Sequence, residues 1–345
     1  MGSKASKNNS DEDIKSLDNL LKNGLESKEL VNDCHSDFDS YNHSCCAFKS
    51  IDNIFYLIYA TKEKSIIFMN LITTQKLNEA KEAHDEDILC FRHILDEINK
   101  KDFVMSVSSN SIKIWDINNN GECKQEIKEK YFYLTSACFL KDKNQIYIVT
   151  SHFESALKSK PISVFDLNGN KIKEINNSNE GKFYIEVYNK NSKNYIITAN
   201  SGSSIAYDYS KNKIYNVYRD ESTLYHKYLI PTKDNKLIIS CEDQTIKVFN
   251  FSSGKLLIKI EEKYNNYDKF LGICLWNNEY IFAGGIGEIK LINIKTGEIV
   301  KKFSENHPTT LQKIIHPEYG ECLITQSRKE EKSSIHLWTI KNGNI

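Results

Sequence analysis

The stretch of sequence that decides the fold is SVSSNSIKIWDI, residues 106–117. Small hydroxylated residues are followed by alternating apolar side chains and then by an aromatic and an acidic residue, Trp115 and Asp116. Successive side chains of a β-strand point to opposite faces, so this spacing predicts a short strand that ends in a turn. A unit of this kind that recurs at a fixed period defines the fold of a whole chain.

The same pattern occurs seven times: SIIFMNL (65–71), SIKIWDI (111–117), PISVFDL (161–167), SSIAYDY (203–209), TIKVFNF (245–251), EIKLINI (288–294) and SIHLWTI (334–340). Aligned on the acidic or amide position, the copies are 46, 50, 42, 42, 43 and 46 residues apart, at Asn70, Asp116, Asp166, Asp208, Asn250, Asn293 and Thr339. A period of this length is that of a four-stranded blade. We therefore predict an all-β fold, a seven-bladed β-propeller of four-stranded antiparallel blades.

The rest of each period also reads as strands. Two apolar runs precede each copy, as in ILCFRH (88–93) and FVMSVS (103–108), and a polar turn with an alternating run follows it, as in GKLLIKI (254–260). The preceding runs are more continuously apolar than the following ones. That difference is expected if the inner strands pack between neighbouring blades while the outer strand faces solvent.

These features resemble those of the WD40 repeat family. Segments 106–117 and 240–251 are similar to its small-x-small-x-Asp-x-Thr-Ile-x-apolar-Trp-Asp pattern, and the Gly-His pair of the family survives in part as Ala83-His84 and at His307. The resemblance covers about residues 35–345. It implies that the positions carrying the pattern are scaffold residues; in this sequence they include Asp116, Asp166, Asp208, Phe249 and Trp338.

Within one blade, the resemblance further implies a hydrogen-bonded chain of Trp, Ser or Thr, His and Asp. Only the second blade retains a partial set, which consists of His84, Ser106 and Trp115, with Asn110 roughly at the acidic position. We interpret these residues as structural. They are not interpreted as a catalytic triad, because nothing in the pattern opens them to a substrate.

The last blade has no fourth strand of its own, since only KNGNI follows Ile340. An N-terminal strand at Glu29–Cys34 is our candidate to complete it, as is common in the family, because a closed ring covers its exposed strand edges. Residues 14–30 have apolar side chains at helical spacing, interrupted by Gly24. We assign residues 1–28 to a polar tail with a short helix and residues 29–345 to the propeller.

The first seven residues, MGSKASK, match an N-myristoylation signal with Gly2 as the acceptor. Two interpretations stay open: a true lipidation site, or a chance match or expression leader. One myristoyl chain anchors weakly and reversibly. A basic segment that could serve as the second membrane-binding signal is weak here, because Lys4 and Lys7 are soon followed by the acidic residues 11–13.

The composition of the chain narrows the range of partners and cofactors that we expect. The 46 basic and 46 acidic residues give a formal net charge of zero, which argues against a nucleic-acid partner. The nine cysteines include no CxxC pair, which predicts free thiols in a reducing compartment and a cytoplasmic location, with the cytosolic face of a membrane as the alternative. We expect no metal and no cofactor, since the adjacent Cys45 and Cys46 would point to opposite faces of one strand.

We therefore predict a non-catalytic scaffold or adaptor that binds other proteins or peptides in a larger complex. The alternatives are a myristoylated peripheral membrane adaptor, and a propeller that binds a small ligand or acts as an enzyme through its central channel. The blade-to-blade linkers and the loops between second and third strands emerge on one face, and they carry aromatic residues of the kind that dominate binding hot spots. The candidate binding residues there are Tyr131, Phe132, Tyr133, Phe153, Lys158, Tyr264, Tyr267 and Arg328.

Overall fold

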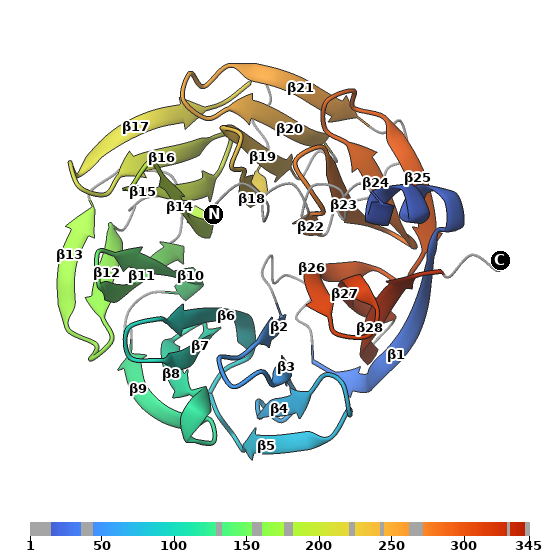
Figure 1. The fold of residues 1–345 in the computed structure, drawn as a ribbon. Helices are drawn as coiled ribbons and strands as arrows, with labels where there is room; N and C mark the ends of the chain where they lie inside the picture. The colour runs from blue at the N-terminus through green and yellow to red at the C-terminus, as the bar shows by residue number, and fades with distance from the viewer. Residues whose placement is uncertain are drawn as a thin grey trace, which may run out of the picture.

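Seven four-stranded antiparallel sheets are arranged in a ring around a central channel, as the repeat predicts (Figure 1). The structure is a computed structural model that describes residues 15–35, 44–128, 133–153, 161–175, 182–220, 225–241, 245–261, 272–329 and 332–341. The first strand of each blade lies innermost and the fourth lies at the rim (Figure 1).

Blades 1 to 4 take their four strands from consecutive parts of the chain. Blade 1 contains β2 (Cys45–Lys49), β3 (Phe55–Ala60), β4 (Ile66–Asn70) and β5 (Lys76–Ala80). Blade 2 contains β6 (Ile88–Asp96), β7 (Lys101–Ser108), β8 (Ser111–Asp116) and β9 (Glu122–Lys128), with a 3-10 turn, η1, at Ile117–Asn119. Blade 3 contains β10 (Tyr133–Asp142), β11 (Gln145–Phe153), β12 (Ile162–Asp166) and β13 (Lys171–Ile175). Blade 4 contains β14 (Lys182–Lys190), β15 (Lys193–Asn200), β16 (Ser204–Asp208) and β17 (Lys213–Tyr218).

Blade 7 alone combines strands from both ends of the described chain. Blade 5 contains β18 (His226–Pro231), β19 (Lys236–Cys241), β20 (Thr245–Asn250) and β21 (Leu256–Glu261). Blade 6 contains β22 (Gly272–Leu275), β23 (Tyr280–Gly285), β24 (Glu288–Asn293) and β25 (Ile299–Ser304). Blade 7 contains β26 (Pro308–His316), β27 (Gly320–Lys329) and β28 (Lys332–Ile340), and β1 (Leu25–Cys34) is its fourth strand.

The burial of the strands follows from their place in the blade. In β7 all residues but the first are buried, whereas exposed and half-buried residues alternate along β25. The second strand of each blade is covered by a neighbouring blade on both faces of the sheet. The side chains that it directs to either face are therefore apolar or hydrogen-bonded. The hydrophobic core therefore lies between the blades. Blades 1 and 2 share one apolar cluster, for example, in which the rings of Phe68 and Trp115 meet edge to face, 6.1 Å apart.

The acidic or amide residue of the repeat fixes the turn after the third strand. Asn70 Oδ1 accepts hydrogen bonds from the backbone N–H groups of Ile72 and Thr73, at 2.9 and 3.0 Å. Asp166 and Asn293 bind the following backbone in the same way. A short side chain that bonds the backbone two residues ahead stabilises a tight turn, which explains why the period holds Asp or Asn there.

The outer strands of blades 1 to 6 share a β-bulge that the sequence pattern did not predict. In each, the pairing of the third and fourth strands shifts beside the residue at the tryptophan position of the repeat. Five of the extra residues are apolar or aromatic and exposed, namely Leu77, Ile172, Tyr215, Leu257 and Val300. A bulge bends an edge strand and interrupts its hydrogen-bonding ladder, which protects the rim against pairing with other chains.

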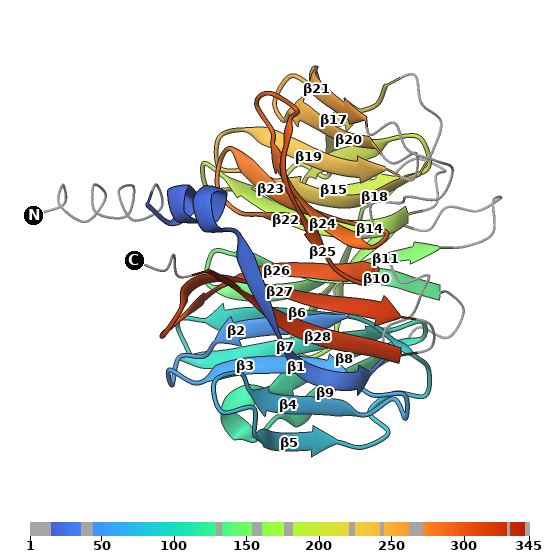
Figure 2. The same ribbon diagram turned by 90° about the vertical axis from the view of Figure 1, so that its right-hand side faces the viewer.

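The N-terminal strand closes the ring, as predicted. β1 pairs antiparallel with β28 along its length, from Leu25 opposite Ile340 to Cys34 opposite Ser333 (Figure 2). The strand begins at Leu25 and not at Glu29, so residues 25–28 belong to blade 7 and not to the tail where the sequence analysis placed them. The helical spacing of apolar residues over 14–30 does not produce a helix at residues 25–28, because their pairing with β28 overrides the local preference.

The helix that precedes β1 covers residues 15–23, and Gly24 follows its last residue. Gly24 has a φ of +80°, which glycine adopts readily, and its N–H bonds to Leu20 O at 2.9 Å. Lys301 Nζ donates to the carbonyl oxygens of Leu20 and Leu21, at 3.3 and 2.7 Å, and so caps the end of the helix. Leu20 is fully buried in a cluster that includes Trp338. The helix is thereby fastened to blades 6 and 7.

Blades 7 and 1 are joined by buried amide side chains. The Gln312 side chain of β26 accepts from Ala47 N at 2.9 Å and donates to Ala47 O at 2.6 Å, so it pairs with β2 as a backbone strand would. Gln326 Nε2 donates to His35 O at 2.7 Å, and its Oε1 accepts from Ser44 Oγ at 2.7 Å. These bonds hold the chain where it passes from β1 into the first blade.

We predict that removal of residues 1–35 lowers the free energy of unfolding by at least about 4 kcal/mol. The deletion removes the buried side chains of Leu20, Leu25, Val31 and Cys34 and uncovers β28, and a single buried leucine is worth about 2–5 kcal/mol. Chemical denaturation would measure the change. Removal of residues 1–14 alone is the matched control, because it leaves the helix and β1 intact. Equal stability of the two truncated proteins would contradict the assigned role of β1.

Candidate protein-binding face and central channel

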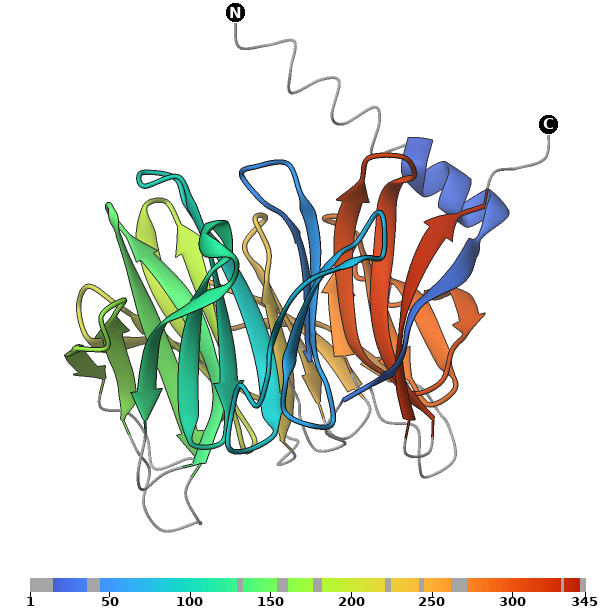
Figure 3. The same cartoon turned by 90° about the horizontal axis from the view of Figure 1, so that it is seen from below.

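The two faces of the ring differ in the loops that they carry. The linker face, as we term it, holds the connections between blades and those between second and third strands; it is the lower side in Figure 3. The hairpin face holds the turns between first and second and between third and fourth strands, and the helix of residues 15–23 lies on it (Figure 3). The candidate binding residues belong to the linker face.

Most of the candidate binding residues lie outside the described part of the chain, namely Tyr131, Phe132, Lys158, Tyr264 and Tyr267. Gly2 lies outside it as well. Phe153 ends β11, where its backbone is the partner of Tyr133 on β10. Arg328 lies near the end of β27, where it is half-buried, and its backbone N–H bonds to His307 O at 3.2 Å. The structure therefore leaves the binding role of this set as a prediction.

Tyr133 is the candidate whose environment the structure shows most fully. It begins β10, the innermost strand of blade 3, and 69 % of its surface is exposed. Tyr225 directly precedes β18, the innermost strand of blade 5, and is 42 % exposed; the sequence analysis missed it. Both residues stand at the linker-face end of an innermost strand, so the two exposed tyrosines belong to this face.

The hydrogen-bonded chain predicted for blade 2 is present. Trp115 Nε1 donates to Ser106 Oγ at 2.8 Å, and this hydroxyl lies 2.7 Å from His84 Nε2. On the other side of the ring, His84 Nδ1 lies 2.8 Å from Ser111 Oγ. Asn110 does not replace the acid directly, because two serine hydroxyls, Ser111 and Ser108, stand between it and the histidine. Since His84 and both hydroxyls are buried, the chain is structural.

A second chain, in blade 7, was not predicted. Trp338 Nε1 donates to Thr325 Oγ1 at 3.0 Å, and this hydroxyl donates to Glu305 Oε2 at 3.3 Å. The expectation that only the second blade keeps such a set was therefore wrong. Glu305, two residues before His307, takes the histidine's place in the chain. The sequence signal that could have identified it is Trp338 with a threonine at the matching position of the preceding strand.

Glu305 also links the closing strand to its blade through a histidine. Its Oε2 lies 3.1 Å from Nδ1 of His336 on β28, and Nε2 of that ring lies 3.7 Å from Glu29 Oε2 on β1. The hydrogen bond to Glu305 raises the pKa of His336 above its ordinary 6.5. A protonated His336 thus attracts carboxylates on both sides, one of which belongs to the N-terminal strand.

The other repeat positions of the sequence analysis are structural as well. Phe249 is fully buried, Asp208 bonds the turn that follows it through Ser210 and Lys211, and Asp166 does the same. Asp116 differs, because its carboxylate bonds Lys101 Nζ at 2.6 Å. None of these side chains lines the central cavity.

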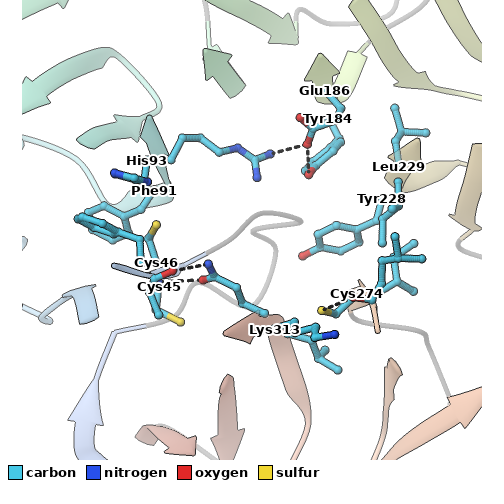
Figure 4. A pocket seen from close by; sticks show the side chains of 18 of the residues that line it. Cys45, Cys46, Phe91, His93, Tyr184, Glu186, Tyr228, Leu229, Cys274 and Lys313 are labelled. Carbon is cyan, nitrogen blue, oxygen red and sulfur yellow. Dashed lines mark hydrogen bonds and ion pairs between the residues drawn. The ribbon is translucent and has the colours of Figure 1, made fainter. Parts of the chain in front are cut away.

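The central channel contains a cavity of about 500 Å³. Innermost strands of six blades line it, and Tyr184, Glu186, Tyr228 and Lys313 surround its space in Figure 4. Arg92 Nη2 lies 3.6 Å from Glu186 Oε2, which also accepts a hydrogen bond from Tyr184 at 3.1 Å. Lys313 Nζ bonds Trp276 O at 2.7 Å and the Glu321 carboxylate.

The thiols along this channel are poor nucleophiles. Burial raises the pKa of Cys46 and of Cys274 to about 12, and that of Cys45 well above its ordinary value. At neutral pH these groups stay protonated, and the thiolate is the reactive form of cysteine. Eight of the nine cysteines are buried, and Cys123 is exposed.

Comparison with known proteins identifies the fold. No protein-family model and no curated protein matches the sequence. Among solved structures, the chain is similar to the β-propeller domain of Cps50 (Swd1) from Myceliophteria thermophila, with a TM-score of 0.68, 13 % identity, and coverage of 90 % of this chain and 100 % of that one. The similarity shows the fold alone. Since 1517 solved chains match, it selects an architecture that serves many functions.

Among the residues that the structure describes, no helix has the length and apolar character needed to cross a membrane.

We predict that stability is greatest near pH 6.5 and falls on both sides. The pKa of His336 is higher in the folded protein than in the unfolded chain, whose ordinary value is 6.5. The contribution of His336 to stability is therefore complete below pH 6.5 and is lost as the pH rises through the pKa of the folded state. Burial lowers the pKa of His84 to about 3, so below pH 6.5 the unfolded chain takes up a proton that the native one does not.

Melting temperatures measured from about pH 5.5 to about 8.5 would show both slopes. The His336→Gln variant should lose the decline above pH 6.5 and keep the decline below it. An unchanged alkaline slope in this variant would show that another group causes it.

Proposed function

We propose that this protein is a WD40-type propeller that acts as a non-catalytic scaffold and binds other proteins through its linker face. The observation that carries the proposal is Tyr133, a large aromatic side chain that is 69 % exposed where β10 begins on this face. Exposed tyrosines supply much of the binding energy at protein interfaces, because they bury a large area at a small cost in side-chain entropy. Tyr225, directly before β18, adds a second exposed tyrosine on the same face.

Membership of the WD40 family is supported by the hydrogen bonds inside blade 2. Trp115, Ser106 and His84 form the chain that the resemblance implies, and the period and the Asp or Asn turn residues agree with it. The departures are the serines between His84 and Asn110 and the use of Glu305 in blade 7. Both preserve a satisfied tryptophan N–H, which is the physical requirement at that buried position.

Three properties support a protein-binding role that involves neither catalysis nor a nucleic-acid partner. The channel thiols are held protonated by burial. The His84 ring is enclosed between two serine hydroxyls and is 3 % exposed, so it cannot reach a substrate. The net charge of zero favours a protein or peptide partner over a nucleic acid. We further infer a cytoplasmic location from the buried cysteines and the lack of a CxxC pair, with acylation of Gly2 kept as the alternative route to a membrane surface.

We predict that the double substitution of Tyr133 and Tyr225 by alanine reduces recovery of bound proteins at least tenfold in affinity purification from native cells, because a hot-spot residue contributes about 2 kcal/mol or more. Quantitative mass spectrometry of the captured proteins is the measurement. Tyr319→Ala is the matched control, since Tyr319 is 45 % exposed in the turn before β27, on the hairpin face. Equal recovery by both variants would remove the linker face as the binding surface.

A further inference from the structure

The turns on the hairpin face differ in charge from one side of the ring to the other. Counted from the last residue of one strand to the first of the next, the six turns of blades 3 to 5 hold nine lysines and four aspartates: residues 142–145, 166–171, 190–193, 208–213, 231–236 and 250–256. The seven corresponding turns of blades 1, 2, 6 and 7 hold five lysines and eight acidic residues. Because the whole chain has no net charge, the positive excess is a local property of blades 3 to 5.

Most of these lysines can reach an external partner, whereas the aspartates are engaged within the fold. Asp166 and Asp208 accept hydrogen bonds from groups of their own turns, and Asp234 accepts from Lys236 Nζ at 2.5 Å. Six of the lysines are exposed and form no ion pair with another described residue; we call them the lysine sector: Lys143, Lys193, Lys211, Lys213, Lys233 and Lys255.

Exposed apolar side chains lie at the edge of the lysine sector. Ile172 is 53 % exposed in β13, and Ile214 is 51 % exposed in β17. Each is the second residue of an outer strand and directly follows a lysine that ends a hairpin-face turn. Lysines beside exposed apolar side chains are typical of surfaces that bind membranes, because lysines attract anionic headgroups while apolar groups enter the interface. A soluble acidic partner would use the lysines alone.

We propose that the hairpin face of blades 3 to 5 binds the surface of an anionic phospholipid bilayer. In this orientation the linker face points away from the membrane, since the two faces are opposite sides of the ring (Figure 3). Lipid binding and the proposed protein binding therefore use different surfaces. Either can fail in experiment without affecting the other.

The same orientation accounts for the N-terminal sequence. The helix of residues 15–23 lies on the hairpin face, so residues 1–14 are joined to the fold on the side that meets the membrane (Figure 3). A myristoyl chain on Gly2 would bind a bilayer weakly by itself, and stable anchoring needs a second signal such as a basic patch. The tail supplies only Lys4 and Lys7, but the lysine sector assembles such a patch from three blades.

The test is cosedimentation of the full, unacylated chain with phosphatidylcholine vesicles prepared with or without phosphatidylserine. We expect at least tenfold stronger binding to the anionic vesicles. The combined substitutions Lys193→Gln, Lys211→Gln and Lys213→Gln should weaken this binding at least tenfold, because one lysine near an anionic leaflet strengthens binding about fivefold. With Gly2 acylated, the same three substitutions should again weaken binding at least tenfold.

The matched control removes the same charge from the opposite face. Lys62→Gln, Lys81→Gln and Lys332→Gln change three exposed lysines of the linker face and should leave vesicle binding unchanged. Equal binding to neutral and anionic vesicles, binding to neither at millimolar lipid, or equal losses in the two triple variants would overturn the proposal. Binding of heparin without binding of vesicles would also overturn it, in favour of a soluble polyanion.

A second variant separates a bilayer from a soluble acidic partner. Ile172→Ser with Ile214→Ser removes two exposed apolar side chains and no charge, so the fold and the lysine sector stay intact. Affinity for the anionic vesicles should fall several-fold while its dependence on salt stays the same, since the lost contribution is apolar. Unchanged affinity in this variant would contradict entry of the isoleucines into the bilayer and would overturn the assignment to a membrane.

Discussion

The pairing of β1 with β28 is the contact on which the ring depends, because it joins the two ends of the described chain in one sheet. Blades 1 to 6 each form from one continuous stretch, and only blade 7 requires strands from opposite ends. Closing the chain has an entropic cost that grows slowly with length, so one well-made strand pair can offset it. The helix before β1 and the Glu305–His336–Glu29 contact add further attachment at the same place.

Closure also determines the geometry of the channel. The innermost strands of blades 7 and 1 meet through the Gln312 side chain, which bonds both polar groups of the Ala47 backbone. With that junction fixed, the innermost strands enclose a cavity whose facing groups come from blades far apart in sequence. Arg92 of blade 2 and Glu186 of blade 4, for example, form an ion pair although 94 residues separate them. The cavity is therefore formed by several blades together and by no single blade.

The sequence predicted those features that repeat. The period and the four strands of each blade follow from spacing that can be read along the chain. The closing strand and the Trp115–Ser106–His84 chain were expected from the resemblance to the WD40 family, and the structure contains both. The outer-strand bulges were missed because their signal is a register shift between paired strands, which one sequence does not display. Glu305 was missed because it occupies an unexpected position in the linker before blade 7.

The Arg92–Glu186 pair in the channel wall lay beyond sequence reasoning for a related cause. Arg92 was read only as part of an inner strand, since its role depends on Glu186 and Tyr184, 94 and 92 positions away, and on a cavity that exists only in the folded ring. The aromatic linker residues, by contrast, could be proposed from composition. Tyr133 is exposed as that proposal requires, and the binding role of the linker face remains a proposal.

Hydrogen exchange of the backbone amides, followed by mass spectrometry, tests the role of β1 most directly. If β1 is an integral strand of blade 7, the amides of Leu25–Cys34 that bond β28 should exchange as slowly as the bonded amides of β27, since both would open only when the ring does. Rapid exchange of β1 while β27 stays protected would contradict the account, because it would show a ring that persists without its closing strand.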